Sequence, residues 1–128
     1  MLEEARFLSS PVAQHPFIAQ LHGKFQTPDA LVLVFRPMLC GDLWAVLYDK
    51  TTVKQAPRET RAKESFLFDG DEQITLDIAR YYLASVCLGL SHLHRHNIAH
   101  RNIKPENILL DEHGHVKLTG YYATVTSP

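Results

Sequence analysis

A polar segment between His100 and Asp111, HRNIKPENILLD, gathers imidazole, guanidinium, ammonium, amide and carboxylate groups in a short stretch of chain. Two of its side chains, Asn102 and Asn107, are amides, which form hydrogen bonds but offer no basic oxygen at neutral pH. A positioned base such as a carboxylate or an imidazole is what proton abstraction from a hydroxyl group needs. Asn102 therefore does not supply a general base to this segment.

Histidines are the second group that could do chemistry, and six of the eight lie between residues 92 and 115. His92 and His96 are four residues apart, a spacing with which two imidazoles on one helix face can bind zinc. A structural zinc site normally needs four converging ligands, and no cysteine or acidic residue is placed with this pair. We therefore interpret these histidines as polar residues of the fold.

The first third of the chain predicts one helix and one hairpin. Residues 2–9 have apolar side chains at helical spacing, and strands are expected at 22–26 and 30–36, joined by the tight-turn sequence Thr27-Pro28-Asp29. The second strand is apolar throughout Leu31-Val32-Leu33-Val34-Phe35, a pattern typical of a strand covered on both faces.

The longest expected helix covers residues 76–94, and Thr75 has the hydroxyl group of a suitable N-cap. Its apolar side chains recur at helical spacing and predict the face that packs on the rest of the protein. That predicted face consists of Leu76, Ala79, Leu83, Val86, Leu90 and Leu93.

Shorter elements flank this helix on both sides. Asp42 is suited to cap a short helix before it, and residues 50–71 have the polar composition of an exposed loop. After the long helix we expect a loop at 97–107 and then a β-hairpin with strands at 108–110 and 116–118.

Composition excludes some classes of protein. The chain has 45% apolar residues, and 13 Lys and Arg against 14 Asp and Glu leave no broad basic field for nucleic acid or an anionic membrane. Cys40 and Cys87 lack CxxC spacing, which favours a reducing compartment with both thiols as small buried apolar groups. Because no signal region and no membrane-length apolar run occur, we expect a cytoplasmic protein without nucleic-acid or membrane partners.

Several phrases, in order along the chain, resemble the protein kinase family, and within it the AGC group of serine/threonine kinases. They are His15-Pro16-Phe17-Ile18, Leu21-His22-Gly23-Lys24-Phe25-Gln26-Thr27, Cys40-Gly41-Asp42-Leu43, Leu90-Ser91-His92-Leu93-His94 and the segment from His100 to Asp111. Separate motifs in the family's order are more specific than one motif alone.

This resemblance implies an α+β class and a partial protein-kinase-like fold. The expected parts are helix C, strands 4 and 5, the hinge, helices D and E and the catalytic-loop hairpin, without the glycine-rich loop and the later C-lobe. It implies one partial kinase-like domain over residues 1–128, with an N-lobe remnant at 1–36 and the hinge and start of the C-lobe at 37–128.

The resemblance also implies roles for individual side chains. Glu4 corresponds to the helix-C glutamate that pairs with the strand-3 lysine, and Leu8, Leu21, His100 and Tyr121 correspond to the family's regulatory spine. On the nucleotide, the implied contacts are Phe35 as gatekeeper, Met38 in the hinge against adenine, Asp42 at the ribose, Leu109 under the base, Lys104 at the transferred phosphate and Asn107 at the second metal ion.

Two departures from the family pattern fall on the catalytic positions. Asn102 stands where the family has the aspartate that accepts the hydroxyl proton, a role that contributes roughly 10²–10⁴-fold to such reactions. Gly120, in Gly120-Tyr121-Tyr122, stands where the family has the Mg²⁺-binding aspartate, and glycine has no oxygen ligand to offer a hard cation. The sequence also contains no G-x-G-x-x-G loop and no V-A-I-K-type lysine, so we expect no phosphotransfer.

Three functional hypotheses follow. The favoured one is an inactive kinase-like domain without a cofactor, which acts by contact with a protein partner or by self-association through an exposed C-lobe surface at Leu83, Val86 and Leu90. The second is a part of an active serine/threonine kinase that uses ATP and Mg²⁺. The third is a weak nucleotide-binding module. Its contacts would be Phe35, Met38, Asp42 and Leu109.

Overall fold

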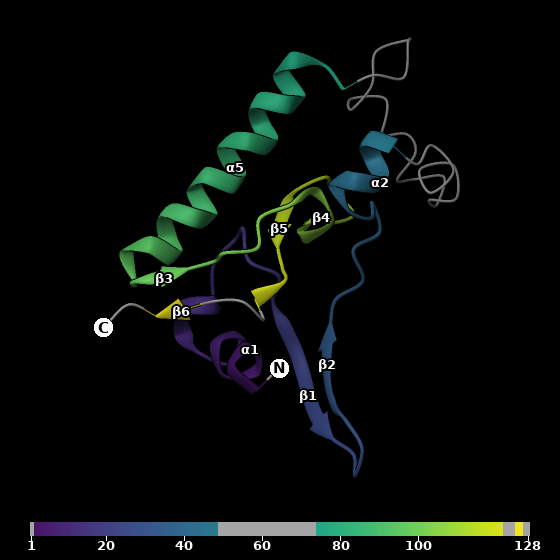
Figure 1. The fold of residues 1–128 in the computed structure, drawn as a ribbon. Coiled ribbons are helices and arrows are strands. Elements are labelled where there is room, and N and C mark those ends of the chain that lie inside the picture. The colour runs from purple at the N-terminus through teal and green to yellow at the C-terminus, as the bar shows by residue number, and fades with distance from the viewer. Residues whose placement is uncertain (1, 49–73, 122–124, 127–128) are drawn as a thin grey trace.

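The structure is a computed structural model, and it describes residues 2–48, 74–121 and 125–126. The predicted loop at 50–71 lies outside the described residues. The elements in order are α1 (Leu2–Leu8), η1 (Pro11–Ala13), β1 (Leu21–Gln26), β2 (Leu31–Phe35), α2 (Leu43–Tyr48), α5 (Leu76–Arg95), β3 (Ile98–Ala99), η2 (Pro105–Asn107), β4 (Ile108–Leu110), β5 (Val116–Leu118) and β6 (Val125–Thr126) (Figure 1). The predicted α+β class is confirmed.

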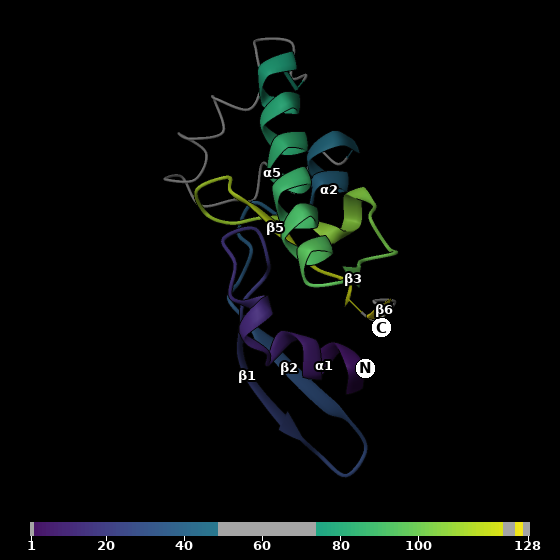
Figure 2. The same cartoon turned by 90° about the vertical axis from the view of Figure 1, so that its left-hand side faces the viewer.

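The β4–β5 hairpin lies between α5 and α2, and the β1–β2 hairpin extends away from α5 with α1 beside it (Figures 1 and 2). The described strands form three separate two-stranded sheets: β1 with β2, β4 with β5, and β3 with β6. Two elements lie within the segment 97–107: β3, which pairs with β6, and η2. The expectation of a loop there is therefore wrong in part.

The β1–β2 hairpin has the predicted turn but not the predicted burial. Its strands are antiparallel, with Gln26 opposite Leu31, and the turn is closed by a bond from the Thr27 amide to the Ala30 carbonyl at 2.8 Å. In the described part of the chain β2 pairs only with β1, and its side chains are half-buried or, at Val34, exposed. The expectation that β2 is covered on both faces is therefore wrong.

Helix α5 begins at the predicted cap, because the Thr75 hydroxyl accepts a hydrogen bond from the Ile78 amide at 3.3 Å. Its buried face matches the predicted one in part: Val86 and Leu93 are buried, and Leu90 packs against the core. Leu76 and Leu83 are each 66% exposed. The buried side consists of Tyr82, Ser85, Val86, Gly89 and Leu93.

Gly89 explains the orientation of α5. A Cβ atom built on Gly89 would lie 2.8 Å from Cδ1 of Leu118, so only the absence of a side chain lets β5 approach this closely. The helix therefore turns its small residues toward the hairpin and leaves Leu83 outside. Cys87 is on the exposed side as well, contrary to the expected burial of both thiols; Cys40 is half-buried, and no disulfide joins them.

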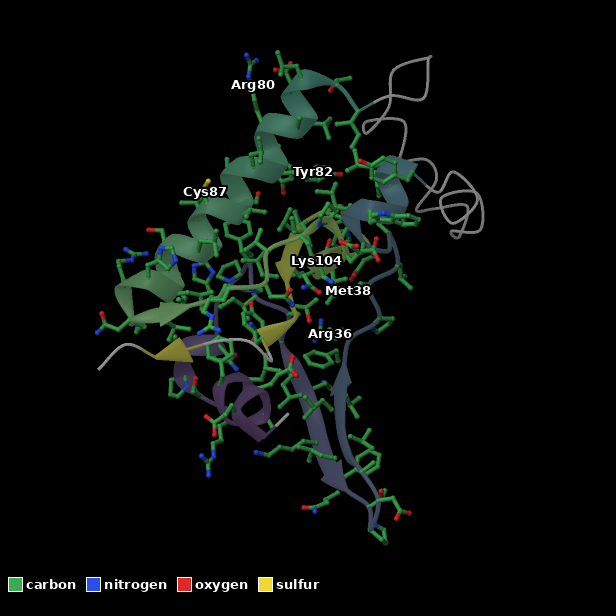
Figure 3. All side chains as sticks on the ribbon, viewed as in Figure 1. Arg36, Met38, Arg80, Tyr82, Cys87 and Lys104 are labelled. Atoms are coloured by element: carbon green, nitrogen blue, oxygen red, sulfur yellow. The ribbon has the colours of Figure 1, made fainter. Side chains whose placement is uncertain are left out.

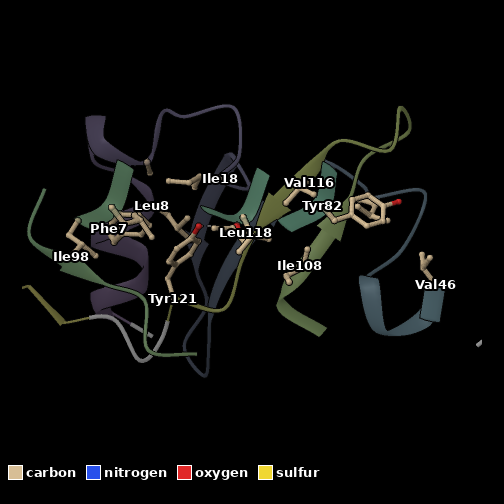
Figure 4. Packing of buried hydrophobic residues seen from close by; sticks show 14 residues of the cluster. Phe7, Leu8, Ile18, Val46, Tyr82, Ile98, Ile108, Val116, Leu118 and Tyr121 are labelled. Atoms are coloured by element: carbon tan, nitrogen blue, oxygen red, sulfur yellow. Dashed lines mark hydrogen bonds between the residues drawn. The ribbon is translucent and has the colours of Figure 1, made fainter. Parts of the chain in front are cut away.

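The core runs from α1 through the β4–β5 hairpin to α5 (Figure 4). Its centre is the contact between Ile18 and Leu118, both fully buried. The Leu118 amide donates to the Phe17 carbonyl at 2.8 Å, and the Ala19 amide donates to the Leu118 carbonyl at 2.9 Å. The segment before β1 is thus attached to β5 by backbone bonds as well as by apolar packing.

The β4–β5 hairpin has the predicted strands and a tightly bonded turn. Oδ1 of Asp111 accepts from the amides of His113 and His115, both at 2.9 Å, and Gly114 has a positive φ of 76°. Burial acts to raise the pKa of Asp111, but the bonds from His115 and His113 outweigh it and lower that pKa.

Candidate functional site around the segment from His100 to Gly120

His100 is the fixed point of the site. Its side chain is buried, Nε2 donates to the Thr119 carbonyl at 3.0 Å, and Nδ1 accepts from the Asn102 amide at 3.2 Å. One nitrogen donates and the other accepts, so the ring is a neutral imidazole. Burial lowers its pKa, against the opposing effect of the backbone bonds.

The two amide side chains, Asn102 and Asn107, bond to the protein itself. Nδ2 of Asn107 donates to the Asn102 carbonyl at 2.8 Å, and Nδ2 of Asn102 donates to the Gly120 carbonyl at 3.3 Å. The Thr119 amide donates to the Asn107 carbonyl at 3.0 Å. Together these bonds join the catalytic-loop segment to the turn after β5.

Gly120 makes this arrangement possible. It has a positive φ of 82°, and a Cβ atom built on it would lie 2.6–2.7 Å from the side-chain amide of Asn107. The Asn107 amide therefore lies where a side chain at position 120 would begin. A glycine is the residue that permits both the left-handed backbone and this close approach.

The residues present do not fit a Mg²⁺ site of the kind the resemblance implies. Hard cations need several oxygen ligands, and Gly120 contributes no side-chain oxygen. Asn107 donates Nδ2 to the Asn102 carbonyl, so its Oδ1 is the one side-chain oxygen that it could offer a cation. In residues 2–48 and 74–121, no group of three or more His, Cys, Asp or Glu side chains could hold a metal ion.

Two cationic side chains of the segment point to solvent. Lys104, labelled in Figure 3, is exposed next to η2, and Arg101 is exposed with a positive φ of 61°. Within the described ranges neither forms an ion pair. The phosphate contact expected of Lys104 stays a prediction.

The structure places together some of the residues that were predicted to contact the nucleotide. Asp42 forms an isolated bridge with Leu109, and the Leu110 amide donates to the Gly41 carbonyl at 2.8 Å, so the segment after the hinge lies on β4. Phe35, Met38 and Leu109 are half-buried. Their contacts with a nucleotide stay predictions.

The Asp42 side chain has a defined partner. Its Oδ1 accepts from the Ala45 amide at 2.7 Å, which makes it the N-cap of α2. The expected cap is therefore confirmed. A carboxylate oxygen that caps a helix has less freedom to turn to a ribose hydroxyl.

The residues expected to form the spine include three fully buried ones, Leu8, His100 and Tyr121, whereas Leu21 is half-buried. The His100 and Tyr121 rings are in contact, with centroids 4.8 Å apart. Burial raises the pKa of Tyr121, and the neighbouring Glu4 adds to this. In the part of the chain that the structure describes, Glu4 forms no ion pair.

The sequence interpretation missed Phe7, whose ring packs on Tyr121 with centroids 4.6 Å apart. Its position three residues after Glu4 on α1 was the available signal, because residues three apart share a helix face. It also missed Tyr82, which is buried with its hydroxyl group unpaired. Its spacing from Ala79 and Val86, three and four residues away, was the available signal, and Tyr81 beside it is exposed.

The pair His92 and His96 does not form a zinc site. Nε2 of His92 donates to the Val12 carbonyl at 2.8 Å, and Nδ1 of His96 donates to the His92 carbonyl at 2.9 Å. Both rings serve as hydrogen-bond donors to backbone carbonyls.

Comparison with known proteins gives one family match and many relatives. The profile of the family described as "Protein kinase domain" matches residues 1–123. The chain is 38% identical over 107 residues to "Ribosomal protein S6 kinase 2 beta" of Xenopus laevis and to "Ribosomal protein S6 kinase alpha-1" of Homo sapiens, in each case over 84% of this chain. It is 37% identical over 113 residues, 88% of this chain, to "G protein-coupled receptor kinase 2" of Drosophila melanogaster.

The matched region covers 14%, 12% and 13%, respectively, of the lengths of these three relatives. The chain therefore spans a small part of the curated relatives that it matches. None of the described helices is long and apolar enough to cross a membrane.

Proposed function

Because this chain belongs to the protein kinase domain family, with AGC-type relatives as its motifs predicted, we propose that it is a catalytically inactive kinase-like domain that acts through protein contact. The family's activity uses ATP and Mg²⁺. The proposal concerns whether the residues of this chain can still support that activity.

The observation that carries the proposal is the position of the Asn107 amide. It occupies the space beside Gly120 where the family's metal-binding side chain begins, and it donates to the Asn102 carbonyl. The Asn102 side chain in turn donates to the Gly120 carbonyl and offers no base. The three positions are thus joined by hydrogen bonds, with an amide where the base is expected and no side-chain oxygen at position 120.

The test is a phosphotransfer assay of the chain with ATP, Mg²⁺ and a mixture of serine- and threonine-containing peptides. We expect no transfer above the level of a Lys104→Met variant, which removes the one cationic side chain expected at the phosphate. If the natural sequence transfers phosphate and the Lys104→Met variant does not, the proposal is wrong. A thermal-shift titration with millimolar ATP, with and without Mg²⁺, checks the alternative of a residual nucleotide-binding module.

Back-substitution at both departures sharpens the test. We expect the double variant Asn102→Asp with Gly120→Asp to remain inactive, because the new side chain at 120 begins against the Asn107 amide. Gain of Mg²⁺-dependent transfer in this variant would show that two side chains alone separate this domain from an active one.

The proposed contact surface is the outer side of α5. Leu76, Leu83 and Leu88 are 56–66% exposed there, and Tyr81 is exposed as well. Val86, which we had expected on this surface, is buried, and Leu90 is half-buried against the core, so only Leu83 of the three predicted residues is exposed here. Exposed apolar side chains gathered on one helix are typical of an interaction surface.

The simplest occupant of this surface is a second copy of the chain, and light scattering over a concentration series tests it. We expect the double variant Leu83→Gln with Leu88→Gln to remain monomeric at concentrations at which the natural sequence associates. Phe25→Gln is the matched control, because Phe25 is 55% exposed on the β1–β2 hairpin, away from α5. Equal association of all three proteins would argue against α5 as the contact.

A further inference from the structure

A stack of imidazole rings joins the segment from Val12 to Phe17 to the C-terminal half of α5, apart from the site just described. His15 packs on His92 with ring centroids 4.1 Å apart and an angle of 25° between the planes. His92 also contacts His96, at 4.7 Å between centroids. Three rings from two separate parts of the chain thus meet at one place.

The hydrogen bonds at this place need His15 to be neutral. Its Nδ1 accepts from the Phe17 amide at 3.3 Å, so that nitrogen carries no proton. A second proton on His15 would place an N–H group against the Phe17 N–H group. Protonation therefore removes this bond and opposes the geometry of the segment.

The charges around His15 act in the same direction. The titratable and charged groups that face it are His92 and Arg95 from α5, with His96 behind His92, and Lys117 from β5. Nζ of Lys117 donates to the Pro16 carbonyl at 2.6 Å, which holds this cation beside the ring. In the described part of the chain, none of the groups acting on His15 is a carboxylate.

From this geometry we propose that the contact between His15 and His92 is a proton-sensitive joint, which holds the Val12–Phe17 segment on α5 while His15 is neutral and loosens when His15 takes up a proton. Two hydrogen bonds beside the joint hold the chain between α1 and β1 in place. His92 donates to the Val12 carbonyl, and Lys117 donates to the Pro16 carbonyl. Loosening the joint weakens the attachment of that whole segment.

The direction of the pH effect follows from the same contacts. Burial first, and then the charges of His92, Arg95 and Lys117, hold the pKa of His15 below its ordinary value of 6.5. The unfolded chain therefore binds this proton at a higher pH than the folded chain does. The joint's stabilisation is complete above pH 6.5 and is lost as the pH falls from 6.5 through the lowered pKa.

His15→Asn is the variant that tests the joint in the full chain. The Asn side chain still offers an oxygen to the amide two residues later, as in an Asx turn, but it does not titrate. Unfolding by urea is followed between pH 5 and pH 8, with EDTA present to exclude metal effects. We expect the dependence of stability on pH between 6.5 and 5 to fall by up to about one proton in His15→Asn.

The matched control is His94→Asn, because His94 is an exposed histidine on α5, the helix that carries His92. It should keep the pH dependence of the natural sequence. If His15→Asn also keeps it in full, the acid sensitivity comes from elsewhere, with His100 as the obvious source, and the proposal is wrong.

Hydrogen exchange of the natural sequence gives a second measurement that needs no variant. On lowering the pH from 7 to 5.5, and after correction for intrinsic exchange rates, the amides of Phe17 and Ile18 should lose protection before those of Asn102 and Thr119. Loss of protection first around His100, or at both places together, would contradict a separate joint at His15.

Discussion

The segment from His100 to Gly120 and the hinge side from Phe35 to Asp42 were both expected to serve the nucleotide, and the structure treats them differently. In the first, the side chains of Asn102 and Asn107 donate to carbonyl groups of the same segment or of the turn after β5. On the second, Phe35 and Met38 keep half-buried apolar surface. The polar side chains therefore bond within the protein, whereas Phe35 packs against the core and Met38 is half-buried.

In the first region the loop has a defined path with amide side chains at positions 102 and 107. Arg101 and Gly120 both have a positive φ, and His100 still connects the two halves of the segment through its ring. Amide groups that donate to carbonyls satisfy the backbone without metal or nucleotide. The variants below test the comparison of the two regions through the free energy of unfolding.

The largest effect is expected for Tyr121→Ala, next to the closed segment. Tyr121 is fully buried between Phe7 and His100, and removing such an aromatic ring costs about 3–5 kcal/mol. Chemical denaturation measures the loss. The matched hinge-side variant Phe35→Ala, at a half-buried position, should lose clearly less, and equal losses would remove the contrast between the two regions.

The second effect is expected for Gly120→Asp, with a loss of about 2–3 kcal/mol from left-handed strain and displacement of the Asn107 amide. Gly114→Asp is its control, because Gly114 has a similar φ of 76° but open space around its Cβ position. That variant should lose only about 1 kcal/mol. The difference between the two urea-unfolding free energies measures how tightly Asn107 fills the site.

A third, smaller effect is expected for Asp42→Ala on the hinge side. Loss of the N-cap bond to the Ala45 amide should cost about 1 kcal/mol, whereas Asp42→Asn should keep most of the stability. Thermal unfolding of the three proteins decides this. A neutral Asp42→Ala would mean that the carboxylate is available for a ligand after all.

The smallest effect has the opposite sign. Tyr82→Phe removes a buried hydroxyl group that has no hydrogen-bond partner, and it should stabilise the protein by up to about 1 kcal/mol. Tyr81→Phe, at the exposed neighbouring position, should change the unfolding free energy little. Destabilisation by Tyr82→Phe would show that this hydroxyl group has a partner in solution.

Periodicity and capping in the sequence predicted the secondary structure well, because both depend on local residue order. The cap at Thr75 and the turn of the β4–β5 hairpin are examples. The orientation of α5 could not be predicted in this way. A count of apolar side chains predicts that Leu83, and not Gly89, lies on the buried face. Close approach of β5 to a glycine is a property of the packed structure, and it decides which side is buried.

For the candidate site, the family resemblance pointed to Asn102, Asn107 and Gly120, and the structure places these three residues together. The resemblance did not show that Asn107 fills the space beside Gly120, because that contact joins residues of different elements across a turn. The stack of His15 on His92 was likewise invisible, although both residues lie in phrases that resemble the family. Ring contacts over such sequence separations follow only from the folded arrangement.

The attachment of Lys117 to Pro16 spans 101 residues of sequence, and the bond of Leu118 to Phe17 beside it spans the same separation. Closing a loop of that length costs about 4 kcal/mol of chain entropy before any contact repays it. During synthesis, the segment before β1 therefore has to wait for β5 before it gains its core partner. α1 and the β1–β2 hairpin are synthesised before β5, so they leave the ribosome without the strand that buries Ile18.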